Sequence, residues 1–290
     1  MNLTTQDLTE LADIAIRAAT EAGQMVARTR PQNVEHKSSG ATLASQVVTE
    51  IDRAAEEIIV DILNPTLEPY ELGLLTEETP DDGGRLTADY FWSIDPIDGT
   101  LPFIEGNPGY SISIALVRRD ATPQIGVVYD PVEETLYHAV AEGGLFRDRQ
   151  PWEPLAQPRA DELSVFVTGG FLAIENHDEF EAALGQAARE MGLTGARLEV
   201  GGGAVMKACA VLDSAPACFF IFPGPTGASL WDYAATACLF AEANAIATDM
   251  SGGALDLNRA DSTNMGHRGA LYASEEEVAQ RVRQLSNMTA

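Results

Sequence analysis

The segment at residues 92–100, WSIDPIDGT, carries two aspartates three positions apart. Its apolar start predicts a strand that ends at Ile94 and brings Asp95 to the edge of a sheet. The proline and the glycine that follow predict a turn, in which the carboxylates of Asp95 and Asp98 converge with the carbonyl of Ile97. An all-oxygen shell of this kind suits a hard divalent cation such as Mg²⁺.

Thr100 stands where a helix can begin after this turn. Amide groups at a helix N-terminus bind phosphate, so the whole string predicts a metal-and-phosphate turn. The D-x-x-D spacing alone is weak evidence, because a chain this acidic contains such pairs by chance in solvated turns. The D-x-D-x-T pattern of haloacid dehalogenases, whose first aspartate is a nucleophile, is absent.

The elements that must position this turn follow from hydrophobic periodicity and from the placement of glycine and proline. Helices are predicted at residues 5–28, 49–63, 178–191, 204–212 and 232–243, and strands at 72–75, 90–94, 110–117, 124–129, 164–168 and 218–222. The polar stretch 36–42 predicts a loop. The mixture indicates an α/β or α+β fold, and the proline-containing stretch 148–161 predicts a boundary between an N-terminal lobe, 1–150, and a C-terminal lobe, 151–290.

Three motifs resemble the signatures of the inositol monophosphatase superfamily of Mg²⁺-dependent, lithium-sensitive phosphatases. They are the string at residues 95–100, the string WDYAA at 231–235, and the acidic pair Glu77–Glu78 that follows a short apolar strand. An upstream family pattern, in which a lysine-containing loop leads into V-T-x-x-D, is matched by Lys37, Thr49 and Asp52. The resemblance covers about two-thirds of the chain.

The resemblance implies a layered α-β-α-β-α sandwich, shared with fructose-1,6-bisphosphatases, in which the N-terminal lobe carries most metal ligands. It implies two or three Mg²⁺ ions, for which Mn²⁺ can substitute. The first ion would be held by Glu77, Asp95 and the Ile97 carbonyl, and the second by Asp95, Asp98 and Asp232. With Glu78 beside them, five carboxylates would lie in one cleft, and they need such cations to stay ionised.

The resemblance also implies roles for residues around the metals. Thr100, Glu78 and Asp98 are the expected catalytic residues, acting on a metal-activated water that attacks phosphorus in line. The amides of Gly99 and Thr100 would bind the phosphate. Lys207 and Gly203 are candidates for substrate contact, because residues 203–207 resemble the G-S-S-x-K stretch of 3′(2′),5′-bisphosphate nucleotidases. Alternatively, Lys207 is a solvated or snorkelling lysine.

Two departures from the family pattern concern activity and substrate. The carboxylate that usually pairs with the threonine is replaced by Gln46, so another carboxylate takes its place, the metal alone suffices, or activity is impaired. General-base catalysis is typically worth about 10²- to 10⁴-fold. Leu101 and Pro102 stand where inositol monophosphatases carry Thr-Asn or Thr-Asp and the nucleotidases Lys-Glu or Lys-Gly.

The composition limits the partners. The chain of 290 residues has 44 acidic and 18 basic side chains, a net charge of −26, which disfavours nucleic-acid polymers and anionic membranes. Carboxylates in excess with only two lysines fit either adaptation to high intracellular salt or an ordinary acidic protein. The three cysteines lie among apolar neighbours, which predicts buried free thiols. The N-terminal segment lacks a signal-peptide pattern, so we expect a cytoplasmic protein, and the resemblance implies a homodimer.

We therefore expect a Mg²⁺-dependent phosphomonoesterase acting on a small phosphorylated polyol or sugar. A 3′(2′),5′-bisphosphate nucleotidase is the alternative within the enzyme class, and a fructose-1,6-bisphosphatase activity stays open. A catalytically impaired regulator that binds metal and phosphate is the alternative from another class.

Overall fold

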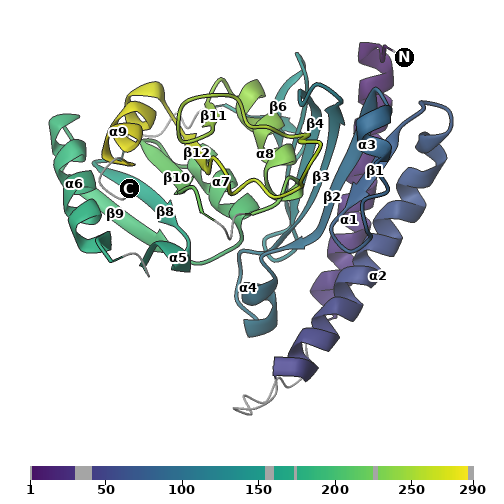
Figure 1. The fold of residues 1–290 in the computed structure, drawn as a ribbon, viewed down its shortest axis with the longest axis horizontal. Helices are drawn as coiled ribbons and strands as arrows, with labels where there is room; N and C mark the ends of the chain where they lie inside the picture. Colours follow the sequence, from purple (N-terminus) through teal and green to yellow (C-terminus); the bar gives the residue numbers. More distant parts are fainter. Residues whose placement is uncertain (1, 30–40, 154–159, 173–174, 225–227, 287–290) are drawn as a thin grey trace.

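The computed structural model describes residues 2–29, 41–153, 160–172, 175–224 and 228–286. Its elements form five layers, helix–sheet–helix–sheet–helix, which confirms the predicted mixed fold and sandwich (Figure 1). Each layer boundary is a hydrophobic core: α1 and α2 against the first sheet, α7 and α8 between the sheets, and α6 and α9 against the second sheet. Among the residues described, no helix is both long and apolar enough to cross a bilayer.

The first sheet is a seven-stranded array in the order β1-β2-β3-β4-β5-β6-β7. Its strands are β1 (Gly73–Thr76), β2 (Tyr90–Asp98), β3 (Ser111–Arg118), β4 (Pro123–Asp130), β5 (Thr135–Val140), β6 (Gly144–Arg147) and β7 (Gln150–Pro151). The strands from β2 onward run antiparallel, whereas β1 pairs parallel with β2. Parallel pairing makes β1 and β2 end at the same edge, and both ends carry acidic residues.

The second sheet has five strands in the order β11-β12-β10-β8-β9. They are β8 (Glu162–Val167), β9 (Gly195–Val200), β10 (Ala217–Ile221), β11 (Ile246–Thr248) and β12 (Ala270–Ala273). Apart from β7, which lies within it, the strands of the two sheets lie on either side of the predicted boundary at residues 148–161. Helix α8 nevertheless belongs to the second half of the chain and packs on β3 and β4 of the first sheet, and the division into two lobes stays a prediction.

The helices follow the sequence pattern closely where the pattern is amphipathic. Their bounds are α1 (Thr5–Arg28), α2 (Ala41–Leu67), α3 (Gly84–Thr87), α4 (Thr100–Glu105), α5 (Gly169–Leu172), α6 (His177–Glu190), α7 (Ala204–Leu212), α8 (Trp231–Glu242) and α9 (Glu276–Ser286). A capping box between Thr4 and Asp7 fixes the start of α1. Helix α2 begins earlier and ends later than predicted, so residues 41 and 42 of the expected loop are helical, and Pro65 lies in its last turn.

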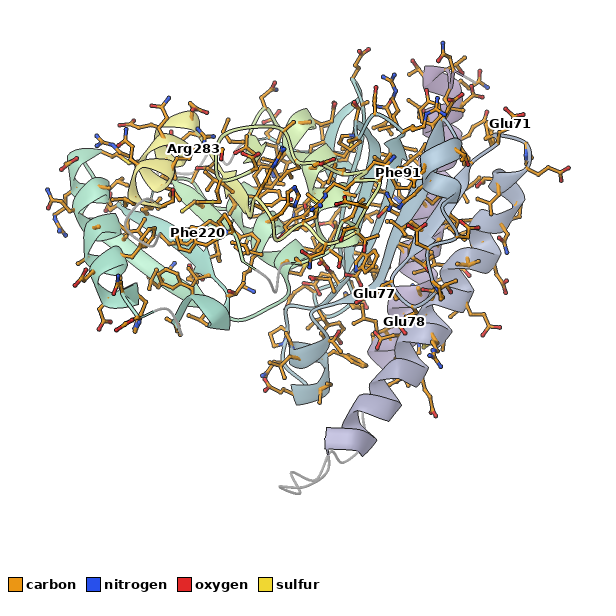
Figure 2. The ribbon with its side chains drawn as sticks, viewed as in Figure 1. Glu71, Glu77, Glu78, Phe91, Phe220 and Arg283 are labelled. Atoms are coloured by element: carbon orange, nitrogen blue, oxygen red, sulfur yellow. The ribbon has the colours of Figure 1, made fainter. Side chains whose placement is uncertain are left out.

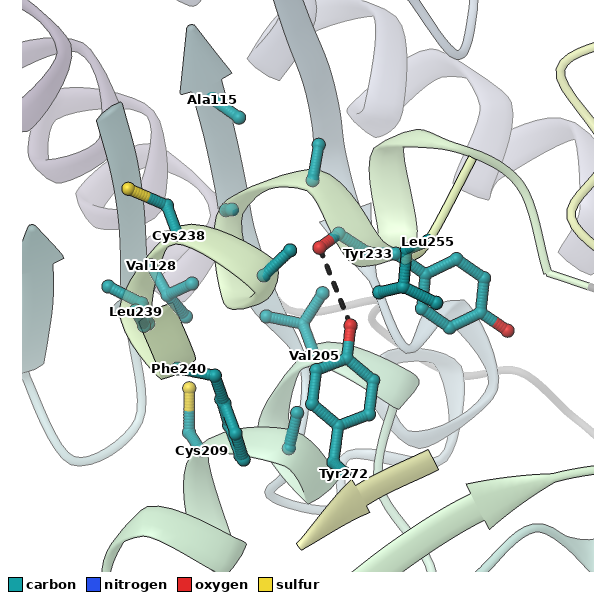
Figure 3. Packing of buried hydrophobic residues seen from close by; sticks show 14 of the residues in the cluster. Ala115, Val128, Val205, Cys209, Tyr233, Cys238, Leu239, Phe240, Leu255 and Tyr272 are labelled. Atoms are coloured by element: carbon teal, nitrogen blue, oxygen red, sulfur yellow. Dashed lines mark hydrogen bonds between the residues drawn. The ribbon is translucent and has the colours of Figure 1, made fainter. Parts of the chain in front are cut away.

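The middle layer is closed by small and aromatic side chains. Figure 3 shows Tyr233 of α8 and Val205 of α7 beside Tyr272 of β12, whereas Cys238 of α8 lies toward Ala115 and Val128 of the first sheet. The Tyr272 hydroxyl donates a hydrogen bond to the Tyr233 carbonyl (3.4 Å). All three cysteines are buried free thiols, as predicted. This packing holds the start of α8, and Asp232 with it, against the first sheet.

Candidate metal centre

Asp95 and Asp98 are carried by the last residues of β2, which does not end at Ile94 as predicted. The strand continues to Asp98, with a shift in its pairing to β3 between Asp95 and Asp98. The physical reason is a β-bulge, which interrupts the ladder of hydrogen bonds between β2 and β3. Pro96 has no N–H to donate to that ladder, so a strand can contain it at such an interruption. The Ile97 amide donates to Asp95 Oδ1 (3.0 Å). The bulge turns both carboxylates to one side, so the predicted convergence is found despite the longer strand.

Asp232 reaches the same point from α8. The carboxylates of Asp95, Asp98 and Asp232 each offer an oxygen atom within 4.8 Å of the others. The Ser229 amide donates to Asp232 Oδ2 (2.5 Å), and Ser113 Oγ on β3 donates to the Trp231 carbonyl (3.2 Å). These two hydrogen bonds fix the start of α8 over β3.

Glu77 joins this set through the parallel pairing of β1 with β2. The Glu77 amide donates to the Ile94 carbonyl (3.2 Å), and its side chain hydrogen-bonds with Asp95. Figure 2 shows Glu77 and Glu78 together at the end of the first sheet, beside α2. We call Glu77, Asp95, Asp98 and Asp232 the acidic centre.

The electrostatics of the acidic centre favour a bound cation. Burial, followed by repulsion from neighbouring carboxylates, raises the pKa of Asp95 well above its ordinary value, and burial raises the pKa of Asp232. Loss of solvation also raises the pKa of Asp98, which is buried, and of Glu77, which keeps an exposed surface, to about 7. The carboxylates of Asp95 and Asp232 approach within 4.8 Å, so both can be ionised only when a positive charge compensates them. A hard divalent cation can supply that charge, because the donor set is all oxygen.

Asp98 also connects the two halves of the chain. Its Oδ1 accepts from the Ala204 amide and its Oδ2 from the Val205 amide, both at 3.0 Å. Asp98 therefore caps α7 from 106 residues away, where the helix's own N-cap residue, Gly203, has no side chain to do so. A Cβ atom on Gly203 would lie 2.0 Å from Asp98 Oδ2, so only glycine fits there.

The phosphate-binding candidates lie next to the acidic centre. Thr100 is the first residue of α4, as predicted, and Gly99 before it has a φ of +84°, which favours glycine. The Thr100 hydroxyl donates to the Ile97 carbonyl (3.4 Å). Both residues thus border the bulge of β2, and their roles toward phosphate stay predictions.

Lys207 is buried, not solvated, with 6% of its surface exposed. Its Nζ donates to the carbonyls of Gly202 and Gly203, the latter at 3.4 Å. Burial lowers the pKa of Lys207, whereas the Asp98 charge raises it. Its cationic group therefore faces the acidic centre and the backbone before α7, and a contact with substrate stays a prediction.

Two acidic residues of α2 belong to this region, and the prediction gave neither of them a role in the site. Glu56 accepts from the Glu78 amide (2.9 Å) and from the Thr79 hydroxyl (2.5 Å), so it holds the turn after β1. Asp52, one turn earlier, is buried, and burial together with Glu78 and Glu77 raises its pKa to about 7. A signal was present: both carboxylates lie on the apolar stripe of α2 that carries Ile59, where an acidic residue is expensive unless it has a partner.

Glu78 is half-buried and lies 3.8 Å from Arg53 Nε. Burial and Glu56 raise its pKa, against the opposing effect of Arg53. Lys37 lies outside the described residues, and the side chains of Gln46 and Thr49 lie outside the described part of α2.

A cavity of about 1080 Å³ opens onto Asp98 and Asp232. Both halves of the chain build it: α4 and the loop after it on one side, and α5, the end of β9 and α7 on the other. Leu101, Pro102, Gly203 and Lys207 all line its wall. The acidic centre is therefore at one end of a space that can hold a small organic molecule.

The known proteins to which this chain is similar include inositol monophosphatases and SuhB proteins. The model of the inositol monophosphatase family matches residues 7–287. A putative Nus factor SuhB from Neisseria meningitidis is 33% identical over 242 residues, 82% of this chain and 86% of the relative. Inositol monophosphatase 2 from Solanum lycopersicum is 28% identical over 264 residues, 88% of this chain and 94% of the relative. The inositol monophosphatase of Anabaena has the same fold, with a TM-score of 0.72, 22% identity and 98% coverage of both chains.

Proposed function

This chain belongs to the inositol monophosphatase family, and we propose that it is a Mg²⁺-dependent phosphomonoesterase that hydrolyses a small phosphorylated polyol or sugar. The observation that carries the proposal is the convergence of Asp95, Asp98 and Asp232 within 4.8 Å at one end of a ligand-sized cavity. Substitution of Mg²⁺ by Mn²⁺, inhibition by lithium and homodimeric assembly are implied by the family resemblance and belong to the proposal.

The residues present fit a divalent metal site. Glu77, Asp95, the Ile97 carbonyl, Asp98 and Asp232 would hold the ions, and the buried carboxylates with raised pKa values require a positive charge when they ionise. Divalent ions bound here would supply Lewis acidity and a water of lowered pKa as the nucleophile.

The protein groups would position the substrate and the water. The Gly99 and Thr100 amides start α4 and, as first-turn amides, have no acceptor within the helix, so they can bind phosphate oxygens. The Thr100 hydroxyl, which donates to the Ile97 carbonyl, would orient the attacking water. Glu78, whose backbone is held by Glu56, would accept a hydrogen bond from the same water. Asp98 is kept in its orientation by the two amides of α7.

A phosphate-release assay with millimolar Mg²⁺ tests the proposal. We expect turnover of inositol 1-phosphate or a sugar phosphate that disappears when Mg²⁺ is chelated and in Asp95→Asn. An exposed aspartate of α2, Asp61, supplies the matched control, Asp61→Asn. Turnover that persists in EDTA would contradict the proposal.

A second candidate is a regulator that binds metal and phosphate with impaired catalysis. Gln46 in place of the expected carboxylate favours it, as does the name Nus factor carried by several relatives. Gln46→Asp separates the two. A gain in turnover of about 10²-fold or more would support an impaired site, whereas no gain or a loss would indicate that this protein uses another group to activate water.

A further inference from the structure

The cavity beside the acidic centre has apolar walls that reach solvent. We call this cavity the alcohol pocket. Its lining consists of some residues from each of the segments 98–109, 166–170 and 199–210, together with Ile221, Ala228 and Asp232. Leu101 and Val200 line it and are 64% and 52% exposed. In the part of the chain that the structure describes, the other exposed large hydrophobic side chains, Val132 and Leu172, are less exposed, at 43% and 42%. Exposed apolar side chains that gather around a pocket indicate a ligand with an apolar surface.

The two exposed side chains come from opposite walls. Leu101 is on α4, in the first half of the chain, and Val200 ends β9, in the second half. Phe166, Met206 and Ile221 add apolar surface between them. A ring that enters the alcohol pocket therefore meets apolar atoms on both sides.

The charged side chains of the alcohol pocket are mostly acidic. Beyond Asp98 and Asp232, the pocket is lined by Glu105 and Glu199, which do not belong to the acidic centre and would not be neutralised by its metals. Asn107 Nδ2 donates to Glu105 (3.0 Å), and Arg197 pairs with Glu199 at 2.8 Å. An anionic group on the far side of a substrate would therefore meet the Glu105 carboxylate, whose partner is neutral, and the Glu199–Arg197 ion pair.

The cation that lines the alcohol pocket, among the described residues, is Lys207. Its Nζ is already engaged by the Gly202 and Gly203 carbonyls, lies 5.8 Å from the centre of the Phe219 ring, and interacts with the Asp98 charge. Two of the three N–H groups of Lys207 are therefore already taken by backbone carbonyls of the pocket wall, and the Asp98 charge competes with any second phosphate for the cation.

We propose that the alcohol pocket selects phosphate monoesters whose alcohol part is uncharged and presents an apolar face, and that it discriminates against a second phosphate. The inference rests on the proposed function for the position of the reacting phosphate. It disfavours the bisphosphate nucleotidase alternative, and it gives Leu101 and Val200 the role of specificity-determining residues.

Three phosphates built on one six-membered ring test the proposal: cyclohexyl phosphate, inositol 1-phosphate and 1,4-cyclohexanediol bisphosphate. Affinity is measured by calorimetry with Mg²⁺, and turnover by phosphate release. We expect cyclohexyl phosphate to bind at least as tightly as inositol 1-phosphate, and the bisphosphate to bind about tenfold more weakly than cyclohexyl phosphate. Equal or tighter binding of the bisphosphate, or no binding of cyclohexyl phosphate, would overturn the proposal.

Variants show whether the named side chains are responsible. Leu101→Asn should weaken cyclohexyl phosphate by about five- to tenfold and inositol 1-phosphate by less than about twofold, because it removes apolar contact. Val132→Asn, at a hydrophobic residue that is 43% exposed and does not line the pocket, is the matched control. The double variant Glu105→Gln, Glu199→Gln should bring the bisphosphate within about threefold of cyclohexyl phosphate. A Leu101→Asn effect equal on both monoesters would contradict the role of Leu101.

The outcomes also separate this inference from the proposed function. If the affinities follow the expected order and no phosphate is released, the proposed function fails and the inference stands. If phosphate is released with Mg²⁺ and the bisphosphate is as good a substrate as the monoesters, the proposed function stands and the inference fails.

Discussion

Asp95 and Asp98 of the acidic centre are 1% and 6% exposed, whereas Leu101, three residues farther along the chain, is 64% exposed on the wall of the alcohol pocket. The carboxylates are fixed by the bulge of β2 and by the first turns of α7 and α8. The apolar residues of the pocket stand on a six-residue helix and at a strand end. The difference indicates that the chemistry depends on packed, hydrogen-bonded elements, while the choice of substrate is made by side chains that can change without disturbing them.

Asp95→Asn should have the largest effect and should act on the acidic centre alone. The Asp95 carboxylate interacts with the charges of both Glu77 and Asp232. Its loss would therefore remove the central one of the expected metal ligands. We expect a fall in turnover of about 10³-fold or more with the fold retained, because an uncharged amide is cheaper to bury than a carboxylate. Phosphate release and circular dichroism measure the two effects, with Asp61→Asn as the control. Substantial activity in Asp95→Asn would show that the metal ligands lie elsewhere.

Gly203→Ala tests whether the centre and the pocket wall are joined at one close contact. The added Cβ would lie 2.0 Å from Asp98 Oδ2 and 2.8 Å from the Gly99 amide nitrogen, so Asp98 or the start of α7 must move. A displacement of about 1 Å can cost on the order of 10²-fold in rate, and thermal stability should fall as well. Gly195→Ala, where a Cβ meets no atom within 4 Å, is the control. Unchanged activity in Gly203→Ala would show that Asp98 tolerates displacement.

Glu56→Gln should weaken the acidic centre from outside it. Glu56 is a positioning residue, because it holds the Glu78 amide and the Thr79 hydroxyl and touches no expected metal ligand position. A glutamine can keep one of these two hydrogen bonds, so we expect turnover to fall about tenfold and the half-saturating Mg²⁺ concentration to rise. Glu57→Gln, at the exposed neighbour, is the matched control. A loss of turnover with no change in the Mg²⁺ requirement would assign Glu56 to another step.

The sequence predicts the acidic centre better than the pocket, for a physical reason. Asp95, Asp98 and Thr100 lie within one turn, so local rules for strands, proline and glycine bring them together. The end of β2 was placed too early because a bulge continues the pairing through a proline, and the cap of α7 by Asp98 joins residues 106 positions apart. No local rule contains such a contact. The alcohol pocket depends on which distant segments face each other. The departure from the family pattern at Leu101 indicates a difference in substrate, but no local rule brings Leu101 and Val200 to the same cavity.

The dependence of stability on pH offers the smallest and most specific test of the acidic centre. Loss of solvation raises the pKa of Glu77, Asp98 and Asp52 to about 7 from ordinary values of 4.5, 3.8 and 3.8. The folded protein therefore binds more protons than the unfolded chain between about pH 4 and pH 7, so without metal its stability falls as the pH rises through this window. Mg²⁺ competes with those protons and stabilises only the folded form.

Melting temperatures should therefore respond to Mg²⁺ more strongly at about pH 8 than at about pH 5, by several degrees in a chain of this size. The measurement is a thermal-denaturation series in EDTA and in about 10 mM Mg²⁺, where the ion should be in excess over the site. Asp95→Asn combined with Asp232→Asn removes two of the carboxylates and should abolish most of the difference between the two pH values. An equal Mg²⁺ effect at both would place the stabilising ions on the exposed acidic surface, and the buried carboxylates would then need another explanation.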